Sequence, residues 1–328
     1  EGVTGVQACA LPISQLEGFD TMVHLTEEND FIVLEGDEYL SSPIDRRPKF
    51  HLYQPNIALI SGIAWDHINV FPTYENYVEQ FEIFIGKITN GGILVYNEED
   101  AEVKRVSKEA TNPIRKLPYH TPKYTVSNGV TLLETPEGDM PIEVFGAHNL
   151  NNLAGAKWIC QNMGVDEAEF YEAIASFKGA SKRLEKIAES KTKVAYKDFA
   201  HSPSKVAATT KAVKEQYPNR TLIACLELHT YSSLNAAFLK EYEGALEYAD
   251  KAVVFYSPDT VKIKQLDEVS YDQIATAFNR KDLIIYTNPT EFKDFLFKEN
   301  LENSALLLMS SGNYGGLNFD EVKGLISN

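Results

Sequence analysis

The sequence has few of the residues and patterns that mark several large classes of protein. It contains only three cysteines, Cys9, Cys160 and Cys225, whose wide spacing fits neither a disulfide framework nor a zinc knuckle. No apolar run approaches the roughly 20 residues that a membrane-spanning helix needs. The start of the chain also lacks the charged stretch and apolar core of a secretion signal. We therefore expect a cytoplasmic protein with no membrane insertion.

Basic residues are scarce as well. The chain has 31 Lys and Arg against 47 Asp and Glu, which gives a formal net charge of −16. A surface that binds duplex nucleic acid must neutralise phosphates with cations, so this balance argues against nucleic acid as the main partner. It does not exclude an anionic small substrate, because a few local cations and a metal ion can override the field of the whole protein.

Two nucleotide-binding signatures are missing from the chain. It has no Gly-x-x-x-x-Gly-Lys-[Ser/Thr] segment, and so no phosphate-binding loop of that type. No Gly-x-Gly-x-x-Gly follows any apolar run, which makes a dinucleotide-dependent oxidoreductase a weak hypothesis.

The patterns that are present predict an α/β protein of two domains. The composition is that of a soluble globular protein, and 328 residues is a length typical of two domains. Apolar runs at 31–34 and 57–60 predict neighbouring strands buried on both faces, as in a parallel sheet. A third strand is expected at 92–96, and helices at 74–88, 148–163 and 166–177. The segment 101–143, which contains five prolines, predicts short antiparallel strands.

A second alternating pattern begins at Val194. Pro203 is a good first residue for a helix, and Ser202 before it is a good N-cap. The small, polar and basic segment 178–183 separates the two patterns, and we predict a linker there, with domains over 15–180 and 181–328. Strands alternating with helices indicate a Rossmann-like second domain. Its predicted strands are 194–196, 222–226, 252–256, 283–286 and 305–309.

The first 14 residues differ from the rest. No initiator Met precedes them, and their sequence resembles translated adaptor read-through, so we predict a foreign segment. A native loop with a short strand is the alternative. Coherent sequence begins at Gln15.

Two pairs of polar residues follow predicted strands, where open α/β sheets bind ligands. Glu35 and His67 could together hold a divalent cation, with His67 as the weaker partner if the ion is magnesium. The alternative is a helix cap and a loop histidine. Asp198 could bind ribose hydroxyls beside His201, and the helix that starts at Pro203 could favour an anion. The alternative here is a simple capped turn.

Five motifs, in the same order along the chain, resemble the Mur ligase family. Together with the final strand and turn, they extend from the first coherent residues to the last strand. They are Leu34–Tyr39, Trp65–His67, Gly146–Asn152, Ser181–Glu185 and Asp198–Pro203, followed by Met309–Gly316.

The resemblance implies a domain that binds a UDP-sugar, a central ATPase domain and a Rossmann-like last domain. Here 15–180 would be the central domain without its phosphate-binding loop, and 181–328 the last domain. The likeness is greatest to the murein peptide ligase branch, which joins UDP-N-acetylmuramate to the tripeptide L-Ala-γ-D-Glu-meso-diaminopimelate through an acyl phosphate in peptidoglycan assembly. The alternatives are a UDP-N-acetylmuramate–L-alanine ligase and a non-catalytic nucleotide-binding module. We expect the chain alone to be inactive, because the loop and the sugar domain are missing.

The resemblance also implies roles for single residues around ATP and Mg²⁺. Glu35 and His67 would help to hold two magnesium ions, and Arg183 would reach the phosphates. Asn149 would contact adenine with support from Asn152, while Asp198 would bind the ribose close to His201. Lys197 and Ser202 depart from the family pattern. The candidates for contact with the tripeptide are His229, Thr230, Tyr231 and Asn313, although His229 could merely hydrogen-bond a turn.

Overall fold

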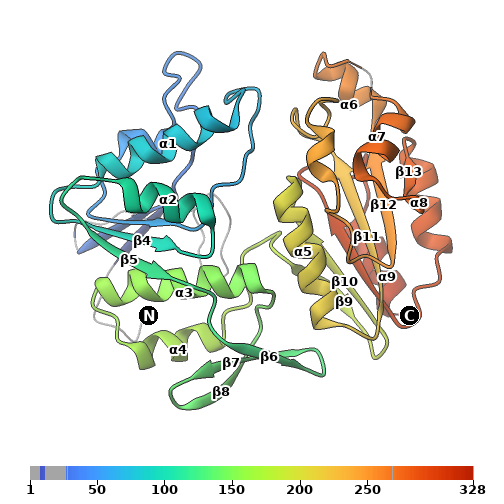
Figure 1. The fold of residues 1–328 in the computed structure, drawn as a ribbon. Helices are drawn as coiled ribbons and strands as arrows, with labels where there is room; N and C mark the ends of the chain where they lie inside the picture. The colour runs from blue at the N-terminus through green and yellow to red at the C-terminus, as the bar shows by residue number, and fades with distance from the viewer. Residues whose placement is uncertain (1–7, 12–26, 28, 268, 328) are drawn as a thin grey trace. The chain divides into compact units, whose positions relative to one another are not determined.

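The computed structural model describes residues 8–11, 27, 29–267 and 269–327. It divides the chain into two compact units, unit 1 from Glu1 to Ala180 and unit 2 from Ser181 to Asn328 (Figure 1). Of segment 1–14, for which we predicted a foreign origin, only the backbone of strand β1 (Ala8–Leu11) lies within the described residues.

Unit 1 combines a parallel α/β core with a separate antiparallel sheet. Strands β3, β4 and β5 form the parallel sheet in that order, β6, β7 and β8 form the antiparallel one, and β2 pairs with β1. The strands are β2 (Phe31–Leu34), β3 (Ile57–Ile60), β4 (Ile93–Asn97), β5 (Arg115–Tyr119), β6 (Tyr124–Ser127), β7 (Val130–Thr135) and β8 (Gly138–Ile142). The helices are η1 (Lys49–Leu52), α1 (Tyr74–Lys87), α2 (Ala101–Glu109), α3 (Ala147–Asn162) and α4 (Glu167–Ala175).

Helices cover both faces of the parallel sheet of unit 1. The Thr73 side chain caps α1, whose apolar residues Phe84 and Ile85 pack with Leu94 of β4. On the other face, Ala154 of α3 packs with Val95 and Tyr119. This two-sided burial accounts for the run of apolar residues in β4.

Two expectations for unit 1 are wrong. The strand at 31–34 is not buried on both faces, because Ile32 is 57% and Val33 41% exposed, and it pairs with β1 rather than with β3. Four apolar residues in a row do not encode which strand they pair with. The segment 101–143 does contain antiparallel strands, but 101–109 is helix α2, capped by Asp100, and 115–119 is a parallel strand.

Unit 2 is built on one sheet, with the order β13-β12-β11-β14-β10-β9. All neighbouring strands in this sheet are parallel, except that β9 pairs antiparallel with β10. This arrangement confirms the predicted α/β class. The strands are β9 (Glu185–Glu189), β10 (Lys193–Asp198), β11 (Thr221–Leu228), β12 (Lys251–Tyr256), β13 (Ile284–Tyr286) and β14 (Ser304–Met309). The helices are α5 (Pro203–Gln216), η2 (Leu239–Tyr242), α6 (Pro258–Ile263), α7 (Tyr271–Phe278), α8 (Pro289–Lys298) and α9 (Phe319–Ser327).

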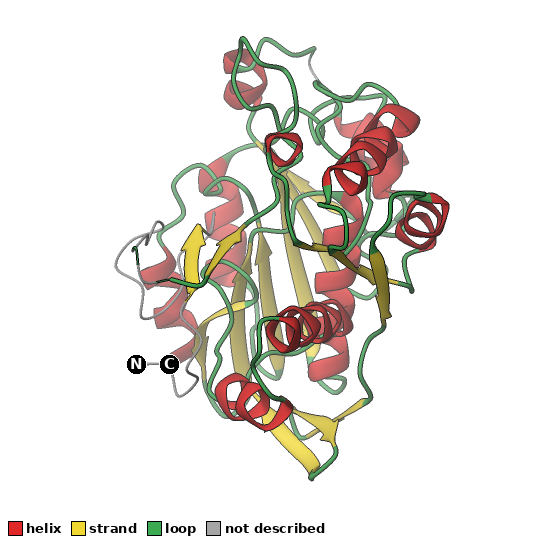
Figure 2. Ribbon diagram, turned by 90° about the vertical axis from the view of Figure 1, so that its left-hand side faces the viewer, coloured by secondary structure: helices red, strands yellow, loops and turns green. Residues whose placement is uncertain are grey.

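Helices flank the strands of this sheet in Figure 1, and Figure 2 distinguishes helices from strands by colour throughout the described chain. Phe292 of α8 and Val322 of α9 pack with Ile223 and Cys225 of β11, while α5 contacts β11 and β14. Helix α5 begins at Pro203 as predicted; Ser202 occupies the N-cap position but makes no capping hydrogen bond with its side chain.

The strand order of unit 2 reverses between β11 and β14. From β11 the chain moves outward to β12 and β13, and then returns to place β14 between β11 and β10. Open α/β sheets bind ligands at such a reversal, beyond the carboxyl ends of the strands. Within the described residues, no helix is long and apolar enough to cross a membrane.

Two helical glycines of unit 1 should respond oppositely to alanine. A Cβ at Gly155 of α3 would lie 2.7 Å from Leu59 Cδ1 and 3.0 Å from Cζ of the buried Tyr119, whereas one at Gly86 of α1 would meet nothing within 4 Å. We expect Gly155→Ala to lower the free energy of unfolding by about 1–3 kcal/mol through overpacking. Gly86→Ala should raise it by about 0.5–1 kcal/mol, because alanine favours the helix.

Urea unfolding followed by tryptophan fluorescence would measure both changes in the free energy of unfolding, because both tryptophans of the chain, Trp65 and Trp158, lie in unit 1. Stabilisation by both substitutions would contradict the close packing of α3 on the sheet.

Candidate functional site

The acidic segment after β2 meets the loop that carries His67. Nε2 of His67 lies 3.4 Å from Oε1 of Glu38, and the ring of Tyr39 meets the imidazole edge-on at 5.0 Å. Asn69 donates a hydrogen bond to the hydroxyl of Tyr39 at 3.2 Å. Two of the sequence motifs, separated by about one helix and one strand, therefore come together in unit 1.

Local hydrogen bonds fix the direction of His67. Its backbone has a positive φ of 54°, and the buried Asp66 side chain accepts its backbone N–H at 2.7 Å. Glu38 also accepts the hydroxyl of Tyr77 at 3.3 Å. Burial, together with the Glu38 and Asp66 carboxylates, raises the pKa of Tyr77 well above its usual range, so this hydroxyl stays a donor.

Glu38, which the sequence reasoning did not select, makes the direct contact with His67. The predicted Glu35 lies three residues earlier and is exposed. The signal that could have found Glu38 is the motif itself, in which Glu35, Asp37 and Glu38 are all acidic. Asp37 is bound to Lys49, with 2.5 Å between its Oδ2 and Nζ.

The donors in this region fit a magnesium ion held mainly by a nucleotide. Among the described residues, no group of three or more His, Cys, Asp or Glu side chains could hold a metal ion. Magnesium is commonly bound through one or two carboxylates together with water and substrate phosphates, and it needs no cage made entirely of protein. Glu38 and His67, whose side chains meet, offer one carboxylate and one imidazole for a site of that kind, and the exposed Glu35 lies three residues before Glu38.

The asparagines at the start of α3 have three different roles. Asn149 donates to the carbonyl of Phe145 at 2.9 Å, and Asn152 is exposed. The buried Asn151, which the sequence reasoning missed, donates from its Nδ2 to three side-chain oxygens at 3.1–3.2 Å. It therefore anchors α3 to the carboxyl ends of β4 and β5. The three acceptors belong to Asn97, Glu99 and Thr121.

Glu99 is stabilised as a carboxylate by the same contacts. Partial burial opposes ionisation, but hydrogen bonds from Thr121 and Asn151 outweigh it and lower the pKa of Glu99 below its usual 4.5.

In unit 2, Asp198 holds the linker segment. The side chain is buried; its Oδ2 accepts the backbone N–H of Leu184 and its Oδ1 that of Ala200, both at 2.6 Å. Lys182 and Leu184 have positive φ values of 57° and 44°. Both carboxylate oxygens of Asp198 are thus engaged with backbone. Each still has a second lone pair, so the predicted contact with ribose stays a prediction.

Arg183 and His201 both contact Phe199. The exposed guanidinium of Arg183 sits 5.6 Å from the centre of the Phe199 ring. Nδ1 of the buried His201 is 2.8 Å from the carbonyl of Phe199. The structure thus gathers the predicted Arg183, Asp198 and His201 at the end of β10.

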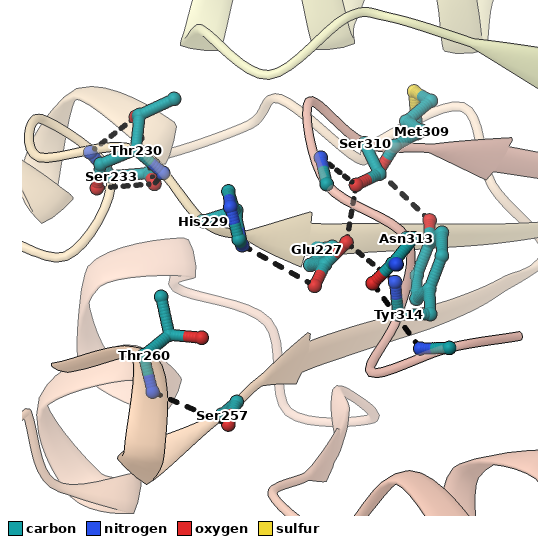
Figure 3. A network of polar contacts seen from close by, with 12 residues as sticks. Glu227, His229, Thr230, Ser233, Ser257, Thr260, Met309, Ser310, Asn313 and Tyr314 are labelled. Atoms are coloured by element: carbon teal, nitrogen blue, oxygen red, sulfur yellow. Dashed lines mark hydrogen bonds and ion pairs between the residues drawn. The ribbon is translucent and has the colours of Figure 1, made fainter. Parts of the chain in front are cut away.

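A second polar group lies at the reversal of strand order, at the carboxyl ends of β11 and β14 (Figure 3). The Glu227 side chain is only 3% exposed and accepts the Ser310 hydroxyl and the backbone N–H of Tyr314, the latter at 2.8 Å. Nδ1 of His229 lies 3.6 Å from its other oxygen. The Tyr314 hydroxyl donates to the carbonyls of Cys225 and Met309, which fixes the loop after β14 to β11.

The other three residues predicted to contact substrate differ in their exposure and in their hydrogen bonds. Thr230 donates its backbone N–H to the Ser233 hydroxyl at 2.9 Å and so shapes its own turn. Tyr231 is exposed, with Nζ of Lys264 4.5 Å from its ring centre. The exposed Asn313 accepts the backbone N–H of Gly316 at 3.2 Å. Sequence reasoning missed Glu227, a charged residue inside an apolar strand.

The family model described as the Mur ligase middle domain matches residues 14–160. A UDP-N-acetylmuramate–L-alanine ligase of Caldicellulosiruptor bescii is 28% identical over 237 residues, which cover 69% of this chain and 50% of that protein. The Escherichia coli UDP-N-acetylmuramate–L-alanyl-γ-D-glutamyl-meso-2,6-diaminoheptandioate ligase is 26% identical over 321 residues, which cover 94% of this chain and 67% of that protein.

A similar solved structure is a murein peptide ligase of Psychrobacter arcticus, with a TM-score of 0.62 and 18% identity. The match covers 98% of this chain and 72% of that one, and it shows the shared fold. The chain spans about half the length of the first curated relatives that it matches.

Replacing Glu99 by Gln should remove a pH-dependent contribution to the stability of unit 1. The pKa of Glu99 is lower in the folded chain than its usual 4.5, so ionisation stabilises the fold above that value. The contribution is lost as the pH falls through the lower folded pKa. We expect wild type and Glu99→Gln to differ more in unfolding free energy at neutral pH than near pH 3, by urea unfolding followed by tryptophan fluorescence.

Glu137, exposed between β7 and β8, supplies the matched control as Glu137→Gln. If the effect of Glu99→Gln were the same at every pH, the hydrogen bonds to the carboxylate would not stabilise its ionised form.

Proposed function

This chain belongs to the Mur ligase family, and we propose that it is part of an ATP-dependent ligase of peptidoglycan synthesis that joins UDP-N-acetylmuramate to a peptide. The observation that carries the proposal is the meeting of the Glu35–Tyr39 segment with His67 in a unit that matches the family's middle domain. The order of the other motifs along the chain and the Rossmann-like sheet of unit 2 support the same function.

The tripeptide is the favoured amine substrate in this proposal. Similarity to the Escherichia coli tripeptide ligase extends over 94% of the chain, against 69% for the L-alanine ligase of Caldicellulosiruptor bescii, at nearly equal identity. L-alanine ligases nevertheless appear repeatedly among the similar proteins, so L-alanine is retained as the second candidate.

Each unit would have a separate task in the reaction. When bound, magnesium would neutralise the charge of the phosphate and carboxylate oxygens that come together during phosphoryl transfer. Glu35, Glu38 and His67 would hold it, with Tyr77 and Asp66 keeping Glu38 and His67 in place. The carboxylate of UDP-N-acetylmuramate would take the γ-phosphoryl group of ATP, which gives an acyl phosphate and ADP.

In unit 2, the residues beyond β11 and β14 would bind and orient the amine. Arg183, carried by the linker that Asp198 fixes, would contribute its positive charge to the phosphates, with Asn149 and Asn152 of unit 1 near the adenine. The amine would attack the acyl carbon, and phosphate would leave. Orientation of the reactants accounts for most of the rate gain in such a step.

The full-length product of the gene should release ADP only when UDP-N-acetylmuramate and an amine are both present. We expect a higher kcat/KM for the tripeptide than for L-alanine, by coupled ADP release with mass spectrometry of the nucleotide product. Preference for L-alanine would favour the second candidate. Binding of ATP without any product would favour a nucleotide-binding module.

Variants of the acidic segment should change the response to magnesium. We expect Glu35→Gln, Glu38→Gln and His67→Asn to lower kcat/KM at limiting Mg²⁺ by about 10–100-fold, the range found when metal-supporting residues are lost. Excess Mg²⁺ should restore part of the activity.

The control is an exposed carboxylate–histidine pair of the same unit, Glu98 and His120, with 3.8 Å between Oε1 and Nδ1. Glu98→Gln and His120→Gln should behave as wild type. An unchanged magnesium dependence in the first three variants would show that the segment does not hold the ion.

A further inference from the structure

In the contact between Glu227 and His229, Nδ1 is the ring nitrogen that faces the carboxylate. Nδ1 faces Oε1 of Glu227 at 3.6 Å, and the Gly312 backbone approaches so closely that a Cβ there would lie 2.8 Å from Nδ1 and 2.9 Å from Cγ. The Nδ1 side of the ring is therefore enclosed. The side chain is still 34% exposed, so the opposite, Nε2 side is the one that a ligand can reach.

The carboxylate of Glu227 is fixed from behind. Its Oε2 accepts two donors, the Ser310 hydroxyl and the Tyr314 backbone N–H, and Tyr314 is itself held by two carbonyls. Ser310 in turn accepts the backbone N–H of Gly312 at 2.6 Å. Oε1 is left as the acceptor that faces His229, and an acceptor at that position favours a proton on Nδ1.

We infer that Glu227 is a positioning residue that holds neutral His229 with Nδ1 protonated and Nε2 free, so that Nε2 accepts a proton from the incoming amine. The inference rests on the proposed function for the identity of the amine. An amino group at neutral pH is mostly an ammonium ion, which has no electron pair for attack. Transfer of one N–H proton to Nε2 leaves that pair on nitrogen to form the amide bond as phosphate departs, and the imidazolium is stabilised by Glu227.

The position of this pair in the fold supports the inference. It lies at the carboxyl ends of β11 and β14, where the strand order reverses and where an open α/β sheet binds its ligands. A carboxylate that orients an imidazole and stabilises its protonated form is a recurrent arrangement for a histidine that takes up a proton.

The tautomer can be measured without any ligase activity. In chain labelled with ¹⁵N-histidine, the Nδ1 and Nε2 signals of His229 would be assigned by their loss in His229→Asn. In wild type we expect a protonated Nδ1 and an unprotonated Nε2 when the ring is neutral. In Glu227→Gln the amide oxygen can keep Ser310 and Tyr314 as donors, and its NH₂ then faces the ring, so the proton should move to Nε2.

Glu299→Gln is the matched control, because Glu299 is another largely buried acid of unit 2 and is bound to Lys251 at 2.7 Å. It should leave the His229 signals unchanged. If Glu227→Gln fails to fold, the tautomer of His229 in the wild-type spectrum is by itself the test of the inference. A proton on Nε2 in wild type, or the same tautomer in wild type and folded Glu227→Gln, would overturn the inference.

A second experiment uses hydroxylamine, a nucleophile that is largely unprotonated at neutral pH and needs no base. In the full-length gene product, Glu227→Gln and His229→Asn should lower kcat with the tripeptide by about 100-fold, within the range of general-base catalysis. Formation of hydroxamate from the acyl phosphate should stay close to wild type.

Equal losses with both nucleophiles, or no loss with the tripeptide, would overturn the role of His229. Absence of hydroxamate in wild type would instead contradict the proposed function, and the tautomer measurement would still stand.

Discussion

Two buried carboxylates of unit 2 each accept a backbone N–H donor from a distant segment of the chain. Glu227 takes the N–H of Tyr314, and Asp198 takes those of Leu184 and Ala200. A buried charge without such partners is costly, so these contacts constrain which loops can lie at the strand ends. In unit 2 the same hydrogen bonds that stabilise the fold also place the linker beside β10 and the last loop beside β11.

Unit 1 uses an uncharged version of the same principle. Asn151 points three hydrogen bonds at the carboxyl ends of β4 and β5, and Gly155, one turn later, lets the helix approach Tyr119 closely. The hydrogen bonds of Asn151 thus determine which strand ends α3 contacts, and Gly155 allows the helix to lie close to the sheet. Asn149, for which a contact with adenine is predicted, lies on the helix that these interactions hold in place.

The sequence predicted those elements whose apolar pattern is set by local burial. The central strands β11 and β14 of unit 2 are buried on both faces and appear as apolar runs, and all the parallel strands of this unit were recognised. Strand β9, half exposed and antiparallel, was missed. The pairing of β2 was wrong, because pairing depends on contacts distant in sequence. Asn151, Glu227 and Glu38 were missed for the same reason: Thr121, Tyr314 and His67, with which they interact, lie 30, 87 and 29 residues away, and no local pattern reveals these contacts.

The residues around Glu227 explain why a charged side chain occupies this position. An apolar residue would continue the buried face of β11, and replacing a buried ion by well-packed apolar groups often stabilises a protein. Here it would leave the Tyr314 N–H and the Ser310 hydroxyl without their acceptor, at about 1–3 kcal/mol for each buried group. Glutamine could serve both donors and would avoid burying a charge. Of these residues only glutamate also offers His229 an acceptor, so the charge is explained by the histidine rather than by the fold.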